Sequence, residues 1–150
     1  MAVRNLSHVA VGVRDMDRSL PFYRDVIGLA VHFDGIEDFG GDPPTRRRGV
    51  YLRWSDDPHA PFVVLDQQLS TTSEGVTKDL YEVGIHHFGF WAEDLDAIAA
   101  RAATAGAPVV YGPSDVDTAL YAEPPGGTIR LLILRDPDGN IVQLDQRVTS

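Results

Sequence analysis

One feature constrains the fold more than any other: the chain repeats itself. The segment that begins at His8 carries a histidine, an apolar stretch, an acidic turn and a stretch with helical spacing, and the segment that begins at His87 carries the same features in the same order. Farther along, VVLDQ at 63–67 returns as VQLDQ at 142–146, and both matches have a separation of 79 residues. Two well-separated matches at one spacing indicate an internal duplication.

The duplication predicts two modules joined by a polar connector, at about residues 1–67, 68–83 and 84–150. Each module is expected to run strand, helix, strand, strand, strand. We therefore predict an α+β fold of two tandem βαβββ modules whose curved mixed sheets surround a shared cavity. The whole chain, 1–150, is expected to be a single domain of ordinary size with a ligand site at the junction of its modules.

The periodicity places the elements. In the first module a strand over 3–13 leads into a helix that ends before Gly28, and the helix is expected to begin at Asp17 or Arg18 because Pro21 is tolerated only near the first turn. Asp15 or Asp17 can cap it. Further strands are expected at 30–33, 49–54 and 62–67, and the second module should have strands at 85–92, 109–111, 128–135 and 141–146 with a helix at 94–105.

Two stretches with several Gly and Pro residues, 34–48 and 112–127, are predicted to be long loops. The first contains the chain's basic cluster, Arg46 to Arg48. We interpret this cluster as a solvated part of the loop, with a contact to an anion as the alternative.

Composition excludes several classes of protein. A net charge of −9 argues against nucleic-acid binding, which rests on cationic contacts to phosphate. The 150 residues contain no apolar run near the roughly 20 residues of a membrane span and no recognisable signal peptide, so a cytoplasmic location is expected. The chain has no cysteine, so a metal ion would have to use histidine, carboxylate or amide ligands.

Three segments carry a family resemblance: SHVAVGVRDMDRSLPFYRDVIGL, HFGFWAEDLDAI and RDPDGNIVQLDQ. They resemble the vicinal oxygen chelate superfamily, which includes glyoxalase I, methylmalonyl-CoA epimerase, extradiol dioxygenases, fosfomycin-modifying enzymes and bleomycin-resistance proteins. The resemblance covers nearly the whole chain and implies the paired-module fold. One scaffold hosts several chemistries, so it does not imply a single activity.

The resemblance also implies a metal site. His8 and His87 match the ligands on the first strand of each module, and Gln143 stands where the family motif DPDGNxxE has its glutamate. The equivalent position of the first module is Val64, which cannot bind a metal. The implied ligands are therefore His8, His87 and Gln143, holding zinc, manganese, nickel or iron(II), with an empty site as the alternative.

The missing carboxylate changes the expected chemistry. Two imidazoles and an amide leave the charge of a divalent ion uncompensated, so the site should bind more weakly than the family's usual one. An amide also cannot serve as the metal-bound general base of glyoxalase-type proton transfer. The carboxylates nearest in sequence are Asp145 and Asp66, each two residues along the strand from the ligand position and thus on its face. Asp145 is the candidate catalytic base, and capping of the sheet edges is the alternative role for both aspartates. Loop carboxylates that could also reach the site are Glu37, Asp38 and Glu123.

Aromatic residues supply candidate ligand contacts. Trp91 shares the strand face of His87, and Trp54 and Tyr121 could add to the same wall, although for Trp54 we favour packing in the core. Val64 and Asp66 complete the predicted substrate-binding set. His86 is expected to point away from His87, and the other two histidines, His32 and His59, are interpreted as ordinary strand-end and loop residues.

Two functions from different classes follow. The first is a metal-dependent lyase, isomerase or oxygenase in which the ion polarises an oxygen of a small organic substrate. The second is a metal-free protein that sequesters an antibiotic or aromatic metabolite, as the bleomycin-resistance branch does. The two retained histidines favour the enzyme. The family resemblance further implies a homodimer, and neither nucleic acid nor membrane is an expected partner.

Overall fold

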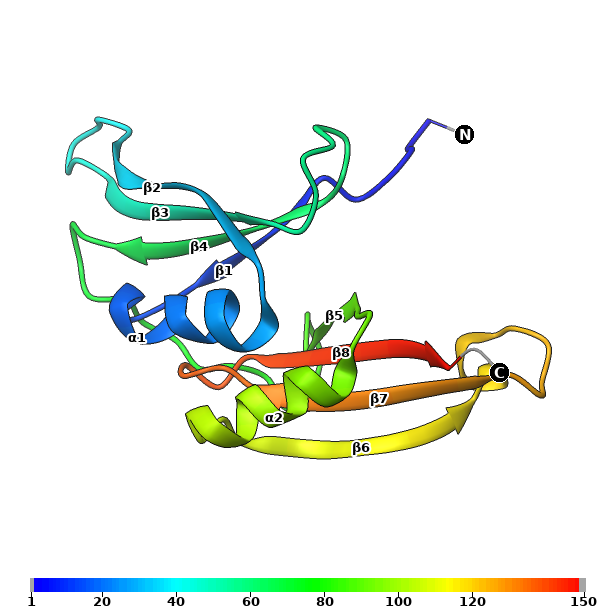
Figure 1. The fold of residues 1–150 in the computed structure, drawn as a ribbon. Coiled ribbons are helices and arrows are strands. Elements are labelled where there is room, and N and C mark those ends of the chain that lie inside the picture. The colour runs from blue at the N-terminus through cyan, green and yellow to red at the C-terminus, as the bar shows by residue number, and fades with distance from the viewer. Residues whose placement is uncertain (1, 149–150) are drawn as a thin grey trace. The chain divides into compact units, whose positions relative to one another are not determined.

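The computed structural model describes residues 2–148 and divides the chain into two compact units, residues 1–75 and 76–150 (Figure 1). Unit 1 contains β1 (His8–Gly12), α1 (Met16–Pro21), η1 (Phe22–Ile27), β2 (Ala30–Asp38), β3 (Arg46–Arg53) and β4 (Phe62–Gln68). Unit 2 contains β5 (Phe88–Trp91), α2 (Leu95–Ala105), β6 (Val109–Asp117), η2 (Thr118–Tyr121), β7 (Thr128–Arg135) and β8 (Ile141–Val148). The predicted α+β class with two βαβββ repeats is confirmed.

Each unit has one four-stranded mixed sheet, and the two sheets are built alike. Their strand orders are β1-β4-β3-β2 and β5-β8-β7-β6, with the first pair parallel and the others antiparallel. In unit 1 Ala10 pairs with Val64, and in unit 2 Gly89 pairs with Gln143. The repeat in the sequence is thus also a repeat in register.

The repeated LDQ segment has a local role that is the same in both units. The Gln67 side chain accepts a hydrogen bond from the backbone N–H of Met16, the first residue of α1, at 2.9 Å. Gln146 does the same for Leu95, the first residue of α2, at 2.8 Å. Each glutamine therefore satisfies a helix N–H that has no partner within the helix, and it ties the last strand of the unit to the start of its helix.

The predicted helix boundaries hold at three of four ends. Asp94 caps α2 by accepting from the N–H of Ala97, and Gly106 ends it with φ of 67°. Gly28 ends η1 in the same left-handed conformation, with φ of 98°. The start of α1 is the exception.

Helix α1 begins at Met16, one or two residues earlier than predicted, after the N-cap Asp15. Pro21 consequently lies at the end of α1 instead of in its first turn, and the chain continues as the π-helical turn η1. Proline has no N–H to donate and crowds the preceding turn, so it disrupts the regular α-helical hydrogen bonds at its position. The prediction failed because it assumed that the helix would keep regular α-helical hydrogen bonds along its whole length.

The two predicted long loops are wrong. Residues 30–38 and 46–53 form the hairpin β2–β3, and 109–117 form the single strand β6, so only short connections remain. The basic cluster consequently lies in β3. Two of its three arginines stand opposite acidic residues of β2, with Arg46 paired to Asp38 and Arg47 to Glu37, and such cross-strand pairs stabilise a sheet.

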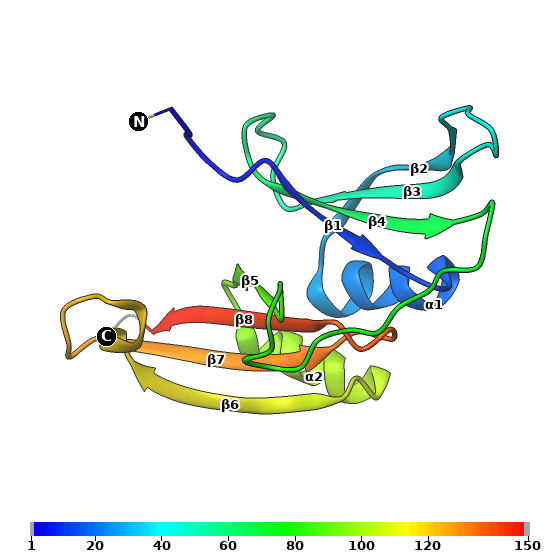
Figure 2. The ribbon, with the colours of Figure 1, turned by 180° about the vertical axis from the view of Figure 1, so that it is seen from behind.

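The two faces of each sheet differ. In unit 1 the buried Val50 and Leu52 of β3 flank the partly exposed Tyr51, whereas the consecutive residues 63–65 of β4 are all buried, and α1 packs on β4. In unit 2, α2 packs on β7 and β8, in front of the sheet in Figure 1 and behind it in Figure 2. Each sheet thus has one face covered by its helix and one without a helix.

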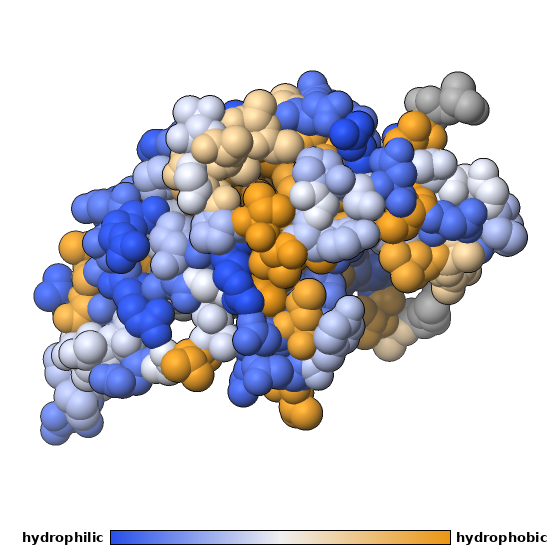
Figure 3. All heavy atoms as spheres, turned by 90° about the horizontal axis from the view of Figure 1, so that it is seen from below, coloured by the Kyte–Doolittle hydropathy of each residue, from blue (hydrophilic) through white to orange (hydrophobic). Residues whose placement is uncertain are grey.

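The outer surface carries both apolar and hydrophilic residues. On the side shown in Figure 3, apolar residues are interspersed with hydrophilic ones. None of the helices within residues 2–148 has the length and apolar character needed to cross a membrane.

Candidate functional site

The helix-free face of unit 2 carries a closed network of three polar side chains. The Tyr121 hydroxyl donates to Asp145 Oδ1 at 2.7 Å, and Gln143 Nε2 donates both to Asp145 Oδ1 (2.9 Å) and to the Tyr121 oxygen (3.1 Å). The prediction that Gln143 and Asp145 share a strand face is therefore confirmed. Asp145 is only 8% exposed, so these bonds compensate for the burial of its carboxylate.

The network fixes the direction of the Gln143 amide. A carboxylate accepts only, and the Tyr121 hydroxyl uses its proton on that carboxylate, so the atom of Gln143 that faces both must be the amino group. The carbonyl oxygen of Gln143 is therefore directed away from the network and is presented as an acceptor. Burial and the hydrogen bond to Asp145 raise the pKa of Tyr121, which keeps its hydroxyl protonated.

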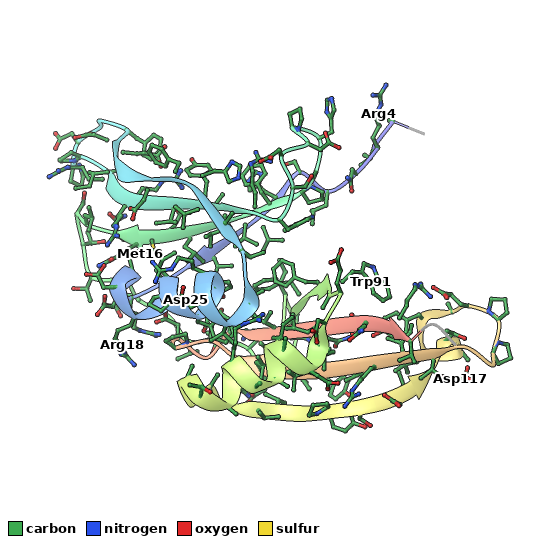
Figure 4. The ribbon with its side chains drawn as sticks, in the orientation of Figure 1. Arg4, Met16, Arg18, Asp25, Trp91 and Asp117 are labelled. Carbon is green, nitrogen blue, oxygen red and sulfur yellow. The ribbon has the colours of Figure 1, made fainter. Side chains whose placement is uncertain are left out.

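An indole ring lies beside this network. Trp91, at the end of β5 (Figure 4), is 58% exposed, and the Tyr121 ring lies 5.8 Å away between ring centres. The guanidinium of Arg147 lies 4.7 Å from the centre of the Trp91 ring and is held by Glu123 through two bonds of 2.5 and 2.9 Å. The ring is therefore supported by its neighbours while most of its surface stays accessible.

His87 precedes β5 and forms a pair with its neighbour. Its Nδ1 lies 2.8 Å from His86 Nδ1, and the ring centres are 4.6 Å apart. The prediction that His86 points away is wrong, because both histidines precede the strand and its alternation does not apply to them. Burial, and then the nearby His86, lower the pKa of His87 and favour its neutral form at pH 7.

Unit 1 carries different chemistry at the equivalent positions. Val64 replaces the glutamine and is buried, while the Asp66 carboxylate forms an ion pair of 2.6 Å with Arg47. Arg47 also pairs with Glu37 at 2.9 Å and donates to the Tyr51 hydroxyl at 3.0 Å. Burial raises the pKa of Asp66, and Arg47 offsets part of this effect.

Two glycines lie next to this charge cluster. A Cβ at Gly49 would collide with the carboxylate of Glu37, whereas Gly12, on the other side of Asp66, has open space around its Cα. The Glu37 carboxylate therefore lies over the backbone of β3 at Gly49, and a larger residue there would displace the end of that side chain.

The remaining predicted residues are placed as follows. Trp54 lies one residue beyond β3 and is 49% exposed, so the favoured interpretation as a core residue is wrong. Glu37 and Asp38 belong to β2 and Glu123 follows η2, and all three pair with arginines. Neither Asp66 nor Asp145 caps a sheet edge, since each pairs with side chains on its own sheet face. Sequence reasoning considered Arg47 only as part of the basic cluster and missed Tyr51 and Arg147, because their side-chain contacts depend on how the strands and loops pack.

The described residues fit a divalent metal poorly. Within either unit, no three of the described His, Asp or Glu side chains are grouped so that they could hold an ion. The implied ligands include no carboxylate, and Asp145, the nearest source of negative charge, is already engaged by Tyr121 and Gln143. His8 belongs to unit 1, where its ring stacks on Phe62 at 5.2 Å.

Comparison with known proteins identifies one family. The model described as "Glyoxalase/Bleomycin resistance protein/Dioxygenase superfamily" matches residues 5–144. No curated protein matches the sequence.

Many solved structures share the fold. An antibiotic-binding protein, TnmS3 from Streptomyces sp. CB03234, is 24% identical to this chain with a TM-score of 0.62. A glyoxalase family protein from Bacillus cereus is 20% identical with a TM-score of 0.73. Each of these two similarities covers 99% of both chains. Glyoxalase I of Leishmania major, described as trypanothione-dependent, is 20% identical with a TM-score of 0.64 over 95% of this chain and 86% of that one. Identities this low establish the shared fold only.

Proposed function

The chain belongs to the Glyoxalase/Bleomycin resistance protein/Dioxygenase superfamily, and on that premise we propose that it binds a small organic molecule on the helix-free faces of its sheets without a metal ion. One observation carries the proposal: the Tyr121–Asp145–Gln143 network lies beside the accessible ring of Trp91. A fixed acceptor next to a supported aromatic surface is a typical arrangement for binding a partly apolar ligand.

The energetics favour binding at this place. The carbonyl oxygen of Gln143 is oriented before a ligand arrives, so little side-chain entropy is lost when it accepts a hydrogen bond. Trp91 is likewise held by Arg147 and Tyr121. The antibiotic-binding relative supports this class of function, since it has the same fold over its whole length.

Tryptophan fluorescence tests the proposal. Aromatic antibiotics and metabolites would be titrated into the wild type and into Trp54→Phe, which leaves Trp91 as the only tryptophan. We expect a ligand that quenches Trp91 in both proteins, and Trp91→Ala should weaken its binding about tenfold, the effect of about 1.4 kcal/mol of lost ring contact. Ligands that bind equally well to Trp91→Ala, or a broad panel without any ligand, would contradict the proposal.

A metal-dependent lyase, isomerase or oxygenase is the second candidate. It is favoured by the two histidines at equivalent repeat positions, His8 and His87, and by the lowered pKa of His87, because a neutral imidazole is the form that binds a metal. A bound ion would act as a Lewis acid on a substrate oxygen, and Asp145 would be the base. The ligand set without a carboxylate makes this the weaker candidate.

Elemental analysis distinguishes the metal-free binding protein from the metal-dependent enzyme. Wild type, His8→Ala and His87→Ala would be incubated with zinc, manganese, nickel or iron(II) and their metal content measured after desalting. The first proposal predicts the same low content in all three proteins and ligand binding that survives a chelator. A near-stoichiometric ion in the wild type, lost from both variants, would replace the first candidate with the second.

A further inference from the structure

Unit 1 carries an aromatic row on its helix-free face, which the proposed function leaves without an assigned ligand class. His8 stacks on Phe62 (5.2 Å between ring centres), Phe62 lies 6.0 Å from Tyr51, and Tyr51 meets Phe33 edge-on at 5.3 Å. These four residues come from β1, β4, β3 and β2, so the row crosses the entire sheet. Phe33 is 44% exposed, which leaves part of the row accessible.

Two arginines of β3, Arg47 and Arg53, reach this face, and they differ in whether carboxylates neutralise their charge. Arg47 is paired with two carboxylates, Glu37 and Asp66. The guanidinium of Arg53 instead lies flat against the row, 4.2 Å from the centre of the Phe62 ring, and its one hydrogen bond is a long one of 3.5 Å to the carbonyl oxygen of Ala60.

Arg53 therefore carries a charge without a partner inside its unit. Among the described residues of unit 1, no carboxylate lies within ion-pair distance of its guanidinium. Stacking on Phe62 fixes the plane of the guanidinium, and its edge can then donate two parallel hydrogen bonds to one carboxylate. The net charge of −9 repels anions in general, so an anion bound here must be held by a local contact of this kind.

We propose that this face binds a planar aromatic acid, with the ligand ring against the aromatic row and its carboxylate or ionised phenol paired with Arg53. The inference rests on the proposed function, because it names the chemical class that one of the two sheet faces would take. The indole site of unit 2 offers a neutral acceptor, whereas Arg53 offers a cationic donor. The two units would thus have diverged in the chemical group that each one recognises.

Matched probes test the assignment. Isothermal titration calorimetry would compare 2-naphthoate with its neutral analogue 2-naphthamide, which has the same ring and nearly the same shape. We expect the wild type to prefer the acid by about tenfold, as an additional charge-assisted pair of hydrogen bonds would give. Arg53→Met should abolish the preference and leave the binding of the amide intact, and Phe62→Leu should weaken both probes.

Arg18→Met is the control, since it removes the same charge from α1, on the other side of the sheet (Figure 4). It should keep the preference for the acid. A preference that survives Arg53→Met, equal binding of both probes by the wild type, or binding of neither would overturn the assignment. A protein that fails this test but still quenches Trp91 with other ligands retains the proposed function, whereas failure of both experiments would overturn both.

Discussion

Replacing Gln146 with alanine should destabilise unit 2 by a measurable amount. Its Oε1 accepts from the N–H of Leu95 at 2.8 Å, and its Nε2 donates to the carbonyl oxygen of Glu93 at 2.8 Å. The substitution removes both bonds and leaves the N–H of Leu95, a fully buried residue, without that acceptor. Losing a helix cap of this type costs about 1–2 kcal/mol. For a chain of this size that amounts to a decrease in melting temperature of about 2–8 °C.

Thermal unfolding followed by far-UV circular dichroism measures the change. Gln146→Glu is the matched control, because it keeps the acceptor oxygen and places negative charge at the positive end of α2, so it should lose less than alanine does. Gln67→Ala should cause a smaller loss in unit 1, since there one hydrogen bond, to Met16, is removed. A Gln146→Ala protein that melts within about 1 °C of the wild type would refute the capping role of the LDQ glutamine.

Three further outcomes are expected. Gly49→Ala should lower the free energy of unfolding by at most about 1 kcal/mol in urea unfolding, because its Cβ displaces only the flexible end of Glu37 and weakens the ion pair with Arg47, whereas Gly12→Ala, with open space, should cost less. NMR should show that His87 titrates below the ordinary histidine pKa of 6.5. The folded state then binds the proton less tightly than the unfolded state, so protonation of His87 decreases the stability of the protein as the pH falls below about 6.5. A normal or raised pKa of His87 would contradict this prediction. Tyr121→Phe should lower stability by about 1–2 kcal/mol by removing a hydroxyl bonded to a buried carboxylate, and an unchanged urea midpoint would contradict the network.

The parts of the fold that follow local rules could be predicted from the sequence. Asp94 and Gly106 bound α2 as expected, because a cap and a left-handed terminus depend on residues only a few positions away. The repeat at a separation of 79 residues predicted the shared sheet plan. The strands at 34–38 and 46–48 were missed because the Gly and Pro residues between them suggested one long loop, whereas the two strands pair with each other and place opposite charges side by side.

The candidate site divides in the same way. The shared face of Gln143 and Asp145 follows from strand alternation alone. The donor that completes their network, Tyr121, comes from η2, and the sequence suggested this residue only as part of an aromatic wall. His86 was misplaced because alternation was extended to residues that precede the strand. The spacing of residues in the sequence therefore did not predict the contacts between elements that are distant along the chain.

The parallel pairing of β1 with β4 has a consequence for how the protein is made. Within each unit the first strand synthesised must wait for the last one before its edge is paired, so neither sheet can be completed from a partial unit. The duplication keeps this wait confined to one unit. On the ribosome β1 stays unpaired until β4 has been synthesised, and a chaperone could bind it during that interval; unit 1 can then finish its sheet while unit 2 is still being translated.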